Sequence, residues 1–134
     1  MNKRIAKKWA KALRSGKYKQ GRGLLKQNGE SGIEHCCLGV LCELYDQEMR
    51  KKHKRTLTKS AFGPDYNTFT FDNYDDVLPP IVQKWSEMKS DIGEYDSKTN
   101  GPYIRTLSLT DLNDDEERSF KYIANVIEKN VEEL

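Results

Sequence analysis

The sequence has few cysteines and no long hydrophobic run. Its 134 residues include three cysteines and four prolines, and 36% are hydrophobic. No apolar stretch approaches the roughly 20 residues that cross a membrane, and the basic N-terminal segment lacks the apolar stretch of a signal peptide. Cys36, Cys37 and Cys42 are too clustered for a disulfide framework. We therefore expect a protein of the reducing cytoplasm that does not associate with membranes.

The length predicts a single domain over residues 1–134. A mean hydropathy of −0.87 and 33% charged residues are polar values for a globular protein, but 13 aromatic residues argue against disorder. This composition excludes a collagen, a coiled-coil rod, a membrane protein and a multidomain enzyme.

Charge is distributed unevenly, although the net charge is only +2. Residues 1–60 contain 16 Lys/Arg against 5 Asp/Glu, whereas residues 61–134 contain 7 against 16. The basic residues concentrate at 3–26 and 50–55, and the acidic residues at 72–76 and 111–117. A basic half attracts phosphate, but it can equally pair with the acidic half, within one chain or in a homo-oligomer.

Hydrophobic spacing predicts a first and a second helix. Ile5, Trp9 and Leu13 recur every four residues and form one apolar stripe among lysines. Residues 36–51 carry a broader apolar face, so we expect that helix to be central. Gly39 lies inside it at a cost of about 1 kcal/mol relative to alanine. We expect Gly39 to allow another backbone to come close.

Local signals also mark the start of the later helices. A third helix is predicted to follow the break at Leu78-Pro79-Pro80, because proline suits the first helical turn. Ser108 is the expected N-cap of a short helix, and Ser119 that of the last helix. The last helix has a clear apolar pattern: Phe120, Ile123, Ala124, Ile127, Val131 and Leu134. The first and last helices are expected to pack around the second.

Short strands are expected between the helices. Residues 68–71 alternate with period two, which is typical of a half-buried strand. Arms at 23–27 and 33–35 flank a strong turn signal, and 103–105 is interpreted as a further strand. Residues 89–102 are polar and rich in turn residues, so they are predicted to form a loop. The expected fold class is α+β, with four main helices packed with a small antiparallel sheet or hairpins.

Three sequence blocks, at 9–20, 36–44 and 109–128, form a specific pattern in their order and spacing. The most distinctive part is Cys-Cys-Leu-Gly-Val-Leu-Cys, residues 36–42. Together the blocks resemble a group of small, mostly uncharacterised proteins encoded by tailed bacteriophages and prophages. Tyr122 departs from the pattern, since related proteins often carry an acid there that completes a capping box. The resemblance implies a phage origin and a cytoplasmic site of action, but no activity that transfers residue by residue.

The cysteines and acids raise the questions of a metal site and of a catalytic thiol. Adjacent Cys36 and Cys37 on a helix point about 100° apart, unlike a zinc-binding pair. A thiol beside His35 at a helix N-terminus would have a lowered pKa, but catalysis also needs a base and an orienting group in space. The acids at 111–117 lack calcium-loop spacing. We therefore expect core thiols and solvated acids, with no metal, no cofactor and no enzyme activity.

Residues 18–26 combine a tyrosine, two glycines and several cations. Backbone amides near glycines can cradle phosphate, and arginine binds phosphate through two hydrogen bonds. No nucleotide-hydrolase or dinucleotide fingerprint is present. The alternative is that this segment is only the basic entry to a strand. The candidate ligand-binding residues are Tyr18, Gln20, Arg22 and Lys26, with Tyr103 and Arg105 as a second stacking and cationic pair.

The leading hypothesis is a non-enzymatic phage accessory protein that counters host defence by binding. Its ligand would be a phosphate-bearing signal nucleotide, sequestered in a basic and aromatic pocket, and Arg22→Ala would weaken that binding. The first alternative is a protein–protein inhibitor of a host enzyme or regulator. The others are a nucleic-acid-binding protein that uses residues 3–26 and 50–55, and an enzyme built around Cys36 or Cys37.

Overall fold

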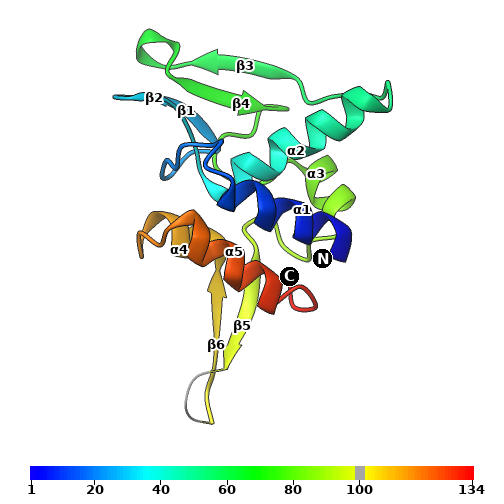
Figure 1. Cartoon of the computed structure of the whole chain (residues 1–134). Helices are drawn as coiled ribbons and strands as arrows, with labels where there is room; N and C mark the ends of the chain where they lie inside the picture. The colour runs from blue at the N-terminus through cyan, green and yellow to red at the C-terminus, as the bar shows by residue number, and fades with distance from the viewer. Residues whose placement is uncertain (99–101) are drawn as a thin grey trace.

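The computed structural model describes residues 1–98 and 102–134 and has an α+β architecture (Figure 1). This confirms the predicted fold class. The helices of the described part are α1 (Lys3–Arg14), α2 (Cys37–Lys51), α3 (Pro80–Ser86), the short α4 (Leu109–Asp114) and α5 (Phe120–Lys129). The strands are β1 (Lys26–Gly29), β2 (Gly32–His35), β3 (Lys59–Phe62), β4 (Thr68–Phe71), β5 (Glu94–Lys98) and β6 (Ile104–Ser108), and a 3-10 turn, η1 (Pro64–Tyr66), precedes β4.

The strands form two separate antiparallel sheets. The larger sheet has the order β2-β1-β4-β3, and Gln27 of β1 pairs with Thr68 of β4. The smaller sheet is the β5–β6 hairpin, in which Glu94 pairs with Ser108. Figure 1 shows the two sheets at opposite ends of the molecule, with α1, α2 and α5 between them. The two ends therefore present different surfaces.

Strand positions agree only in part with the expectations from sequence. β4 occupies the predicted residues. β1 begins at Lys26, later than the arm expected at 23–27, because the tight turn lies between Gly29 and Gly32. The loop predicted over 89–102 is wrong where β5 forms, and 99–101 lie outside the described residues. β5 escapes a pattern search because it is polar, and of its side chains only Tyr95 is buried among those described.

The ends of the helices follow their capping residues. Asn2 accepts hydrogen bonds from the amides of Arg4 and Ile5 at 3.1 and 3.2 Å, which starts α1. Ser108 and Ser119 accept bonds from the amides three residues ahead and start α4 and α5, as predicted. These bonds satisfy amide groups that have no partner within the helix.

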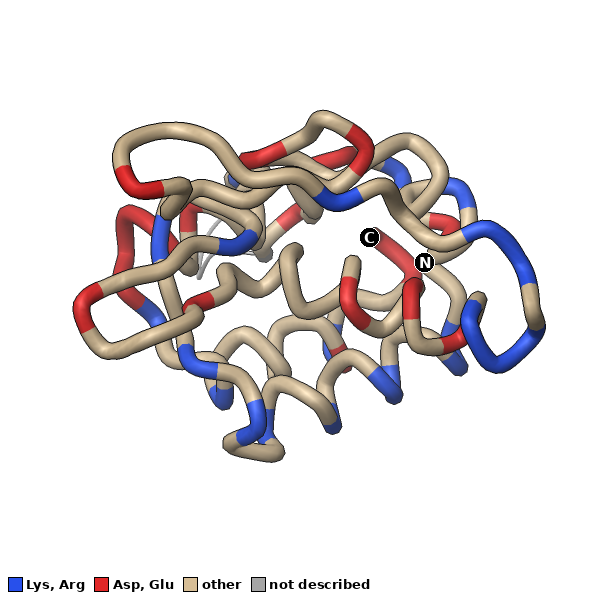
Figure 2. Tube along the Cα trace, turned by 90° about the horizontal axis from the view of Figure 1, so that it is seen from above, with Lys and Arg blue, Asp and Glu red and all other residues tan. Residues whose placement is uncertain are grey.

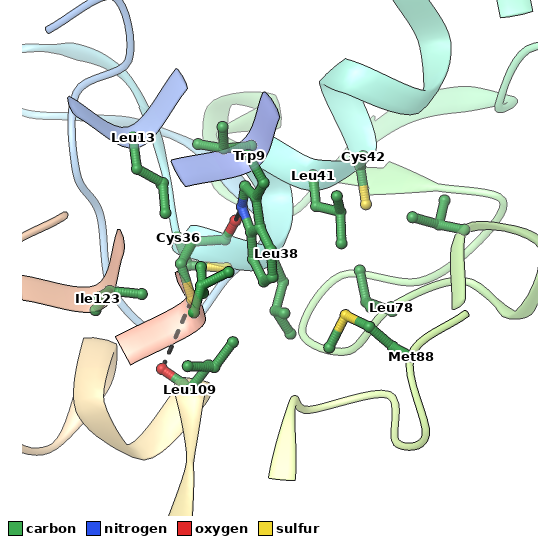
Figure 3. Packing of buried hydrophobic residues seen from close by; sticks show 14 of the residues in the cluster. Trp9, Leu13, Cys36, Leu38, Leu41, Cys42, Leu78, Met88, Leu109 and Ile123 are labelled. Atoms are coloured by element: carbon green, nitrogen blue, oxygen red, sulfur yellow. Dashed lines mark hydrogen bonds between the residues drawn. The ribbon is translucent and has the colours of Figure 1, made fainter. Parts of the chain in front are cut away.

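One core lies among the helices. Figure 3 shows Trp9, Leu38, Leu109 and Ile123 converging from α1, α2, α4 and α5. Trp9 is fully buried, and its indole Nε1 donates to the carbonyl oxygen of Cys37 at 2.9 Å. That bond satisfies the one polar atom of the side chain, which burial would otherwise penalise. The apolar stripe predicted from Ile5, Trp9 and Leu13 therefore lies in the core.

The terminal helices lie side by side, as Figure 1 shows. Arg14 of α1 contacts Glu128 of α5 through two hydrogen bonds of 2.8 Å. The N-terminal ammonium donates to the Val131 carbonyl at 3.0 Å. α1 also packs on α2. It therefore contacts both α5 and α2.

Candidate functional site

The two basic stretches of the sequence meet around one carboxylate of α2. Glu48 accepts two hydrogen bonds from Arg4, at 2.9 and 3.1 Å, and one from Lys52 at 2.7 Å. Lys8 adds a contact of 3.4 Å. Residues far apart in sequence thus form one basic surface along α1 and the end of α2, visible as the run of blue segments in Figure 2. The carboxylate of Glu48 therefore bonds to side chains from both basic stretches.

Two adjacent hollows follow the line between α1 and α2. The first has a volume of about 420 Å³ and lies around Glu48, and the second, of about 230 Å³, ends at Tyr18. Both are lined by Lys8 and Gln47, so they adjoin each other. We call the two hollows together the α1–α2 groove. Its polar lining consists of Arg4, Lys8, Lys11, Ser15, Lys17, Tyr18, Gln47, Glu48, Lys51 and Lys52, with Ala12 and Leu44 as apolar lining.

The groove carries an excess of positive charge. Six basic side chains line the groove, against a single acidic one, Glu48. Hydrogen bonds from Arg4 and Lys52, and from the indole of Trp85, lower the pKa of Glu48 well below its usual value despite its burial, so it stays ionised. Lys11 and Lys51 are exposed and form no ion pair with any described carboxylate. Their charges remain available to an anion.

Tyr18 closes one end of the groove. Its hydroxyl accepts a hydrogen bond from Gln47 at 2.9 Å. The ring meets the imidazole of His35 edge-on, with centroids 5.3 Å apart, and the Lys17 ammonium lies 5.5 Å from the ring centroid. An aromatic side chain next to several cations is the combination that binds a base together with its phosphate.

A second carboxylate cluster lies between α2 and the larger sheet. Glu43 contacts Lys26 at 2.9 Å, Lys59 at 3.1 Å and His35 Nε2 at 3.1 Å. Burial would raise the pKa of Glu43, but the bonds from His35 and Lys26 and the charges of Lys26 and Lys59 lower it well below its usual value. This cluster joins β1, β2 and β3 to α2, and we assign it a structural role.

The structure gives different partners to the residues that the sequence suggested as one binding site. Tyr18 lines the groove. Gln20 uses both ends of its amide internally: it donates to Asn113 at 2.9 Å and to the Arg118 carbonyl at 2.8 Å, and it accepts from Phe120 N at 3.1 Å. Its role is to hold the α4–α5 connection, so we no longer place it in a ligand site.

The remaining candidates also lie outside the groove. The Lys26 ammonium is committed to Glu43 and lies 5.3 Å from the Phe69 ring centroid. Arg22 is exposed, and its guanidinium has no hydrogen bond within the described part of the chain. Tyr103 and Arg105 belong to the β5–β6 hairpin region, at the end of the molecule away from α2 in Figure 1. Sequence proximity therefore grouped side chains that bind different partners in the fold.

Sequence reasoning included residues 3–26 and 50–55 in an alternative nucleic-acid-binding surface, but it did not join Lys8, Lys11, Gln47 and Lys51 into one site. A signal was present, since Arg4, Lys8 and Lys11 recur at helical spacing on α1. Gln47 and Lys51 show the same four-residue spacing on α2. Each pattern alone is that of a solvated helix face. Only the packing of α1 on α2 places the two patterns on opposite sides of one groove.

The cysteines have the environment of core residues. All three are free and buried, and burial raises the pKa of Cys36 to about 12. The pKa values of Cys37 and Cys42 are also raised, first by burial and then by nearby negative groups. Among the described residues, no group of three or more His, Cys, Asp or Glu side chains is arranged to hold a metal ion. The thiols therefore pack in the core, where the Sγ of Cys37 also donates to the Leu109 carbonyl at 3.6 Å (Figure 3).

Comparison with known proteins identifies the family of the chain and no individual relative. The family described as a domain of unknown function (DUF8296) matches residues 1–131. No curated protein and no solved structure matches the chain. Within residues 1–98 and 102–134, none of the helices has the length and apolar character needed to cross a membrane.

Proposed function

We propose, since the chain belongs to the DUF8296 family and carries the α1–α2 groove, that it acts by binding a phosphate-bearing ligand there. The observation that carries this proposal is the convergence of two distant basic stretches on one groove with a single acid. Phosphate oxygens accept hydrogen bonds from lysine and arginine, and the excess charge draws an anion toward the groove.

A nucleotide is the form of phosphate ligand that the groove supports best. Tyr18 offers an aromatic surface at one end, and the exposed ammonium groups of Lys11 and Lys51 offer charge along the groove. The sequence resemblance supports the biological setting, a phage accessory protein in the cytoplasm of an infected or lysogenic host. There the protein would counter host defence by sequestering a nucleotide signal. Such a role requires affinity and no turnover.

Native mass spectrometry tests this proposal directly. The protein is incubated with a mixed pool of cyclic oligonucleotides and ADP-ribose derivatives, and we expect a discrete bound mass at a fixed ratio per chain. The double variant Lys11→Ala/Lys51→Ala removes two groove charges that form no described ion pair, so its fold is retained. Its affinity is expected to fall by about tenfold or more.

A matched variant controls for net charge. Lys84→Ala/Lys121→Ala removes two exposed lysines from α3 and α5, outside the groove, and should leave the bound mass unchanged. A pool that yields only unliganded protein contradicts the nucleotide proposal. Equally weakened nucleotide binding in both double variants would show that binding depends on net charge rather than on the groove.

Nucleic acid is the second candidate ligand, and the extent of the basic surface favours it. The groove opens along α1, and the basic residues Lys54 and Arg55 are exposed beyond it. A polyanion that contacts several lysines loses affinity steeply with salt. Binding of a labelled oligonucleotide with a steep salt slope, reduced by Lys11→Ala/Lys51→Ala and not by the control variant, would assign the groove to nucleic acid instead.

A further inference from the structure

A separate cleft lies between the β5–β6 hairpin and α5. It has a volume of about 610 Å³ and shares no residue with the α1–α2 groove. Figure 1 shows the hairpin projecting from the body of the molecule below α5. The apolar part of the lining comes from Tyr95, Leu107, Leu112, Tyr122 and Val126. We call it the hairpin cleft.

The rim of the hairpin cleft is acidic. Asp96, Glu116, Glu132 and Glu133 line it together with one cation, Lys129. Glu132 and Glu116 have partners in Lys3 and Arg118. Asp96 and Glu133 form no ion pair with any side chain that the structure describes. The cleft therefore retains negative charge beside an apolar floor.

The phenol of Tyr95 provides a second and independent feature of this cleft. The residue is only 6% exposed, yet its hydroxyl has no hydrogen bond to any described residue. Burial, with the nearby Tyr122 and the charges of Glu116 and Asp111, raises the pKa of Tyr95 to about 12. The phenol thus stays protonated beside two residues that line the cleft. The hydroxyl is not among the fully buried polar atoms without a partner, so its oxygen can meet a group bound in the cleft.

The Tyr122 ring shows how a cation is accommodated at the edge of this cleft. The guanidinium of Arg118 lies 4.7 Å from the Tyr122 ring centroid. This is the geometry of a cation–π contact. The chain's own arginine therefore binds to the cleft wall in the way that an incoming arginine or lysine would.

We infer that the hairpin cleft binds a lysine- or arginine-bearing segment of a partner protein. The alkyl stems of such side chains pack against Leu107, Leu112 and Val126, while their charged ends reach Asp96 and Glu133. A donor group of the segment satisfies the Tyr95 oxygen. Charge complementarity selects a basic partner over an acidic one. The inference is independent of the ligand proposed for the α1–α2 groove.

Fluorescence anisotropy with a labelled short peptide of alternating lysine and leucine tests the inference on the full chain. We expect saturable binding at one peptide per chain. Asp96→Asn/Glu133→Gln should weaken it by about tenfold or more, and Tyr95→Phe should weaken it to a smaller extent. Glu30→Gln/Asp65→Asn, which removes two exposed acids from the β1–β2 turn and from η1, should leave it unchanged.

Three results would overturn the inference. The first is equal binding to the cleft variant and to the control variant. The second is equal affinity for a peptide in which serine replaces every leucine, since charge alone would then explain binding. The third is self-association of the protein at low salt with no peptide binding, which would make a second copy the occupant.

Discussion

The carbonyl oxygen of Leu25 occupies the space in which a β-carbon at position 39 would lie. Gly39 is therefore the contact point between α2 and the segment that leads into β1. The absence of a side chain lets this segment approach the helix closely enough to bury Leu25 completely. The sequence-based expectation that another backbone comes close at Gly39 is confirmed.

Gly39→Ala is predicted to destabilise the protein by about 2 kcal/mol or more. Alanine gains up to about 1 kcal/mol in helix propensity. The clash with a backbone oxygen outweighs that gain, because overpacking a core costs about 1–3 kcal/mol and sometimes more. Urea denaturation measures the difference, and Lys51→Ala, on the exposed face of the same helix, should change stability by less than about 0.5 kcal/mol. A stabilising effect of Gly39→Ala would contradict the close approach.

Stability is predicted to fall in acid because of Glu43 and Glu48. Both carboxyls have pKa values lowered in the folded protein. Their stabilising contribution is therefore fully present above the unfolded pKa of about 4.3 and is lost as the pH falls through the folded values. Denaturant midpoints measured at successive pH values check this expectation. Loss of stability that begins well above pH 5 would point to other groups.

Glu48→Gln is predicted to lower the free energy of unfolding by about 2 kcal/mol at neutral pH, because it removes a carboxylate that accepts charge-assisted bonds from Arg4 and Lys52. It should also flatten the acid dependence. Glu30→Gln removes an exposed acid without a described ion pair and should do neither. An unchanged pH profile in Glu48→Gln would show that the carboxylate is not held as described.

The thiols are predicted to be unreactive in the native protein. Cys36, Cys37 and Cys42 are buried, and burial raises the pKa of each. A thiol-specific disulfide reagent needs an accessible thiolate, so it should react slowly at pH 8. Unfolding in denaturant should release all three thiols to the reagent. Rapid labelling of one cysteine in the folded chain would revive the catalytic alternative.

Gln20→Ala is predicted to cost about 2 kcal/mol, because three hydrogen bonds join this side chain to the α4–α5 region. Arg22→Ala should change stability by less than about 0.5 kcal/mol, since the side chain is exposed. Thermal denaturation of the two variants provides the comparison. Equal stability of both would mean that the bonds of Gln20 contribute nothing measurable.

Local features of this protein could be predicted from its sequence. The stripe of Ile5, Trp9 and Leu13 and the caps Ser108 and Ser119 are confirmed, because helix periodicity and capping depend on residues within one or two turns. β4 was predictable from its own alternation. β5 was not, since its polar residues form a strand through pairing with β6.

The tertiary structure alone decided which charges meet. Arg4 and Glu48 are 44 residues apart, and no local pattern connects them. Tyr18 and Lys26 are close in sequence, yet one lines the groove and the other is bound to Glu43. The reason is physical: an ion pair or a groove depends on how helices pack, and packing is set by the apolar faces rather than by the charged residues themselves.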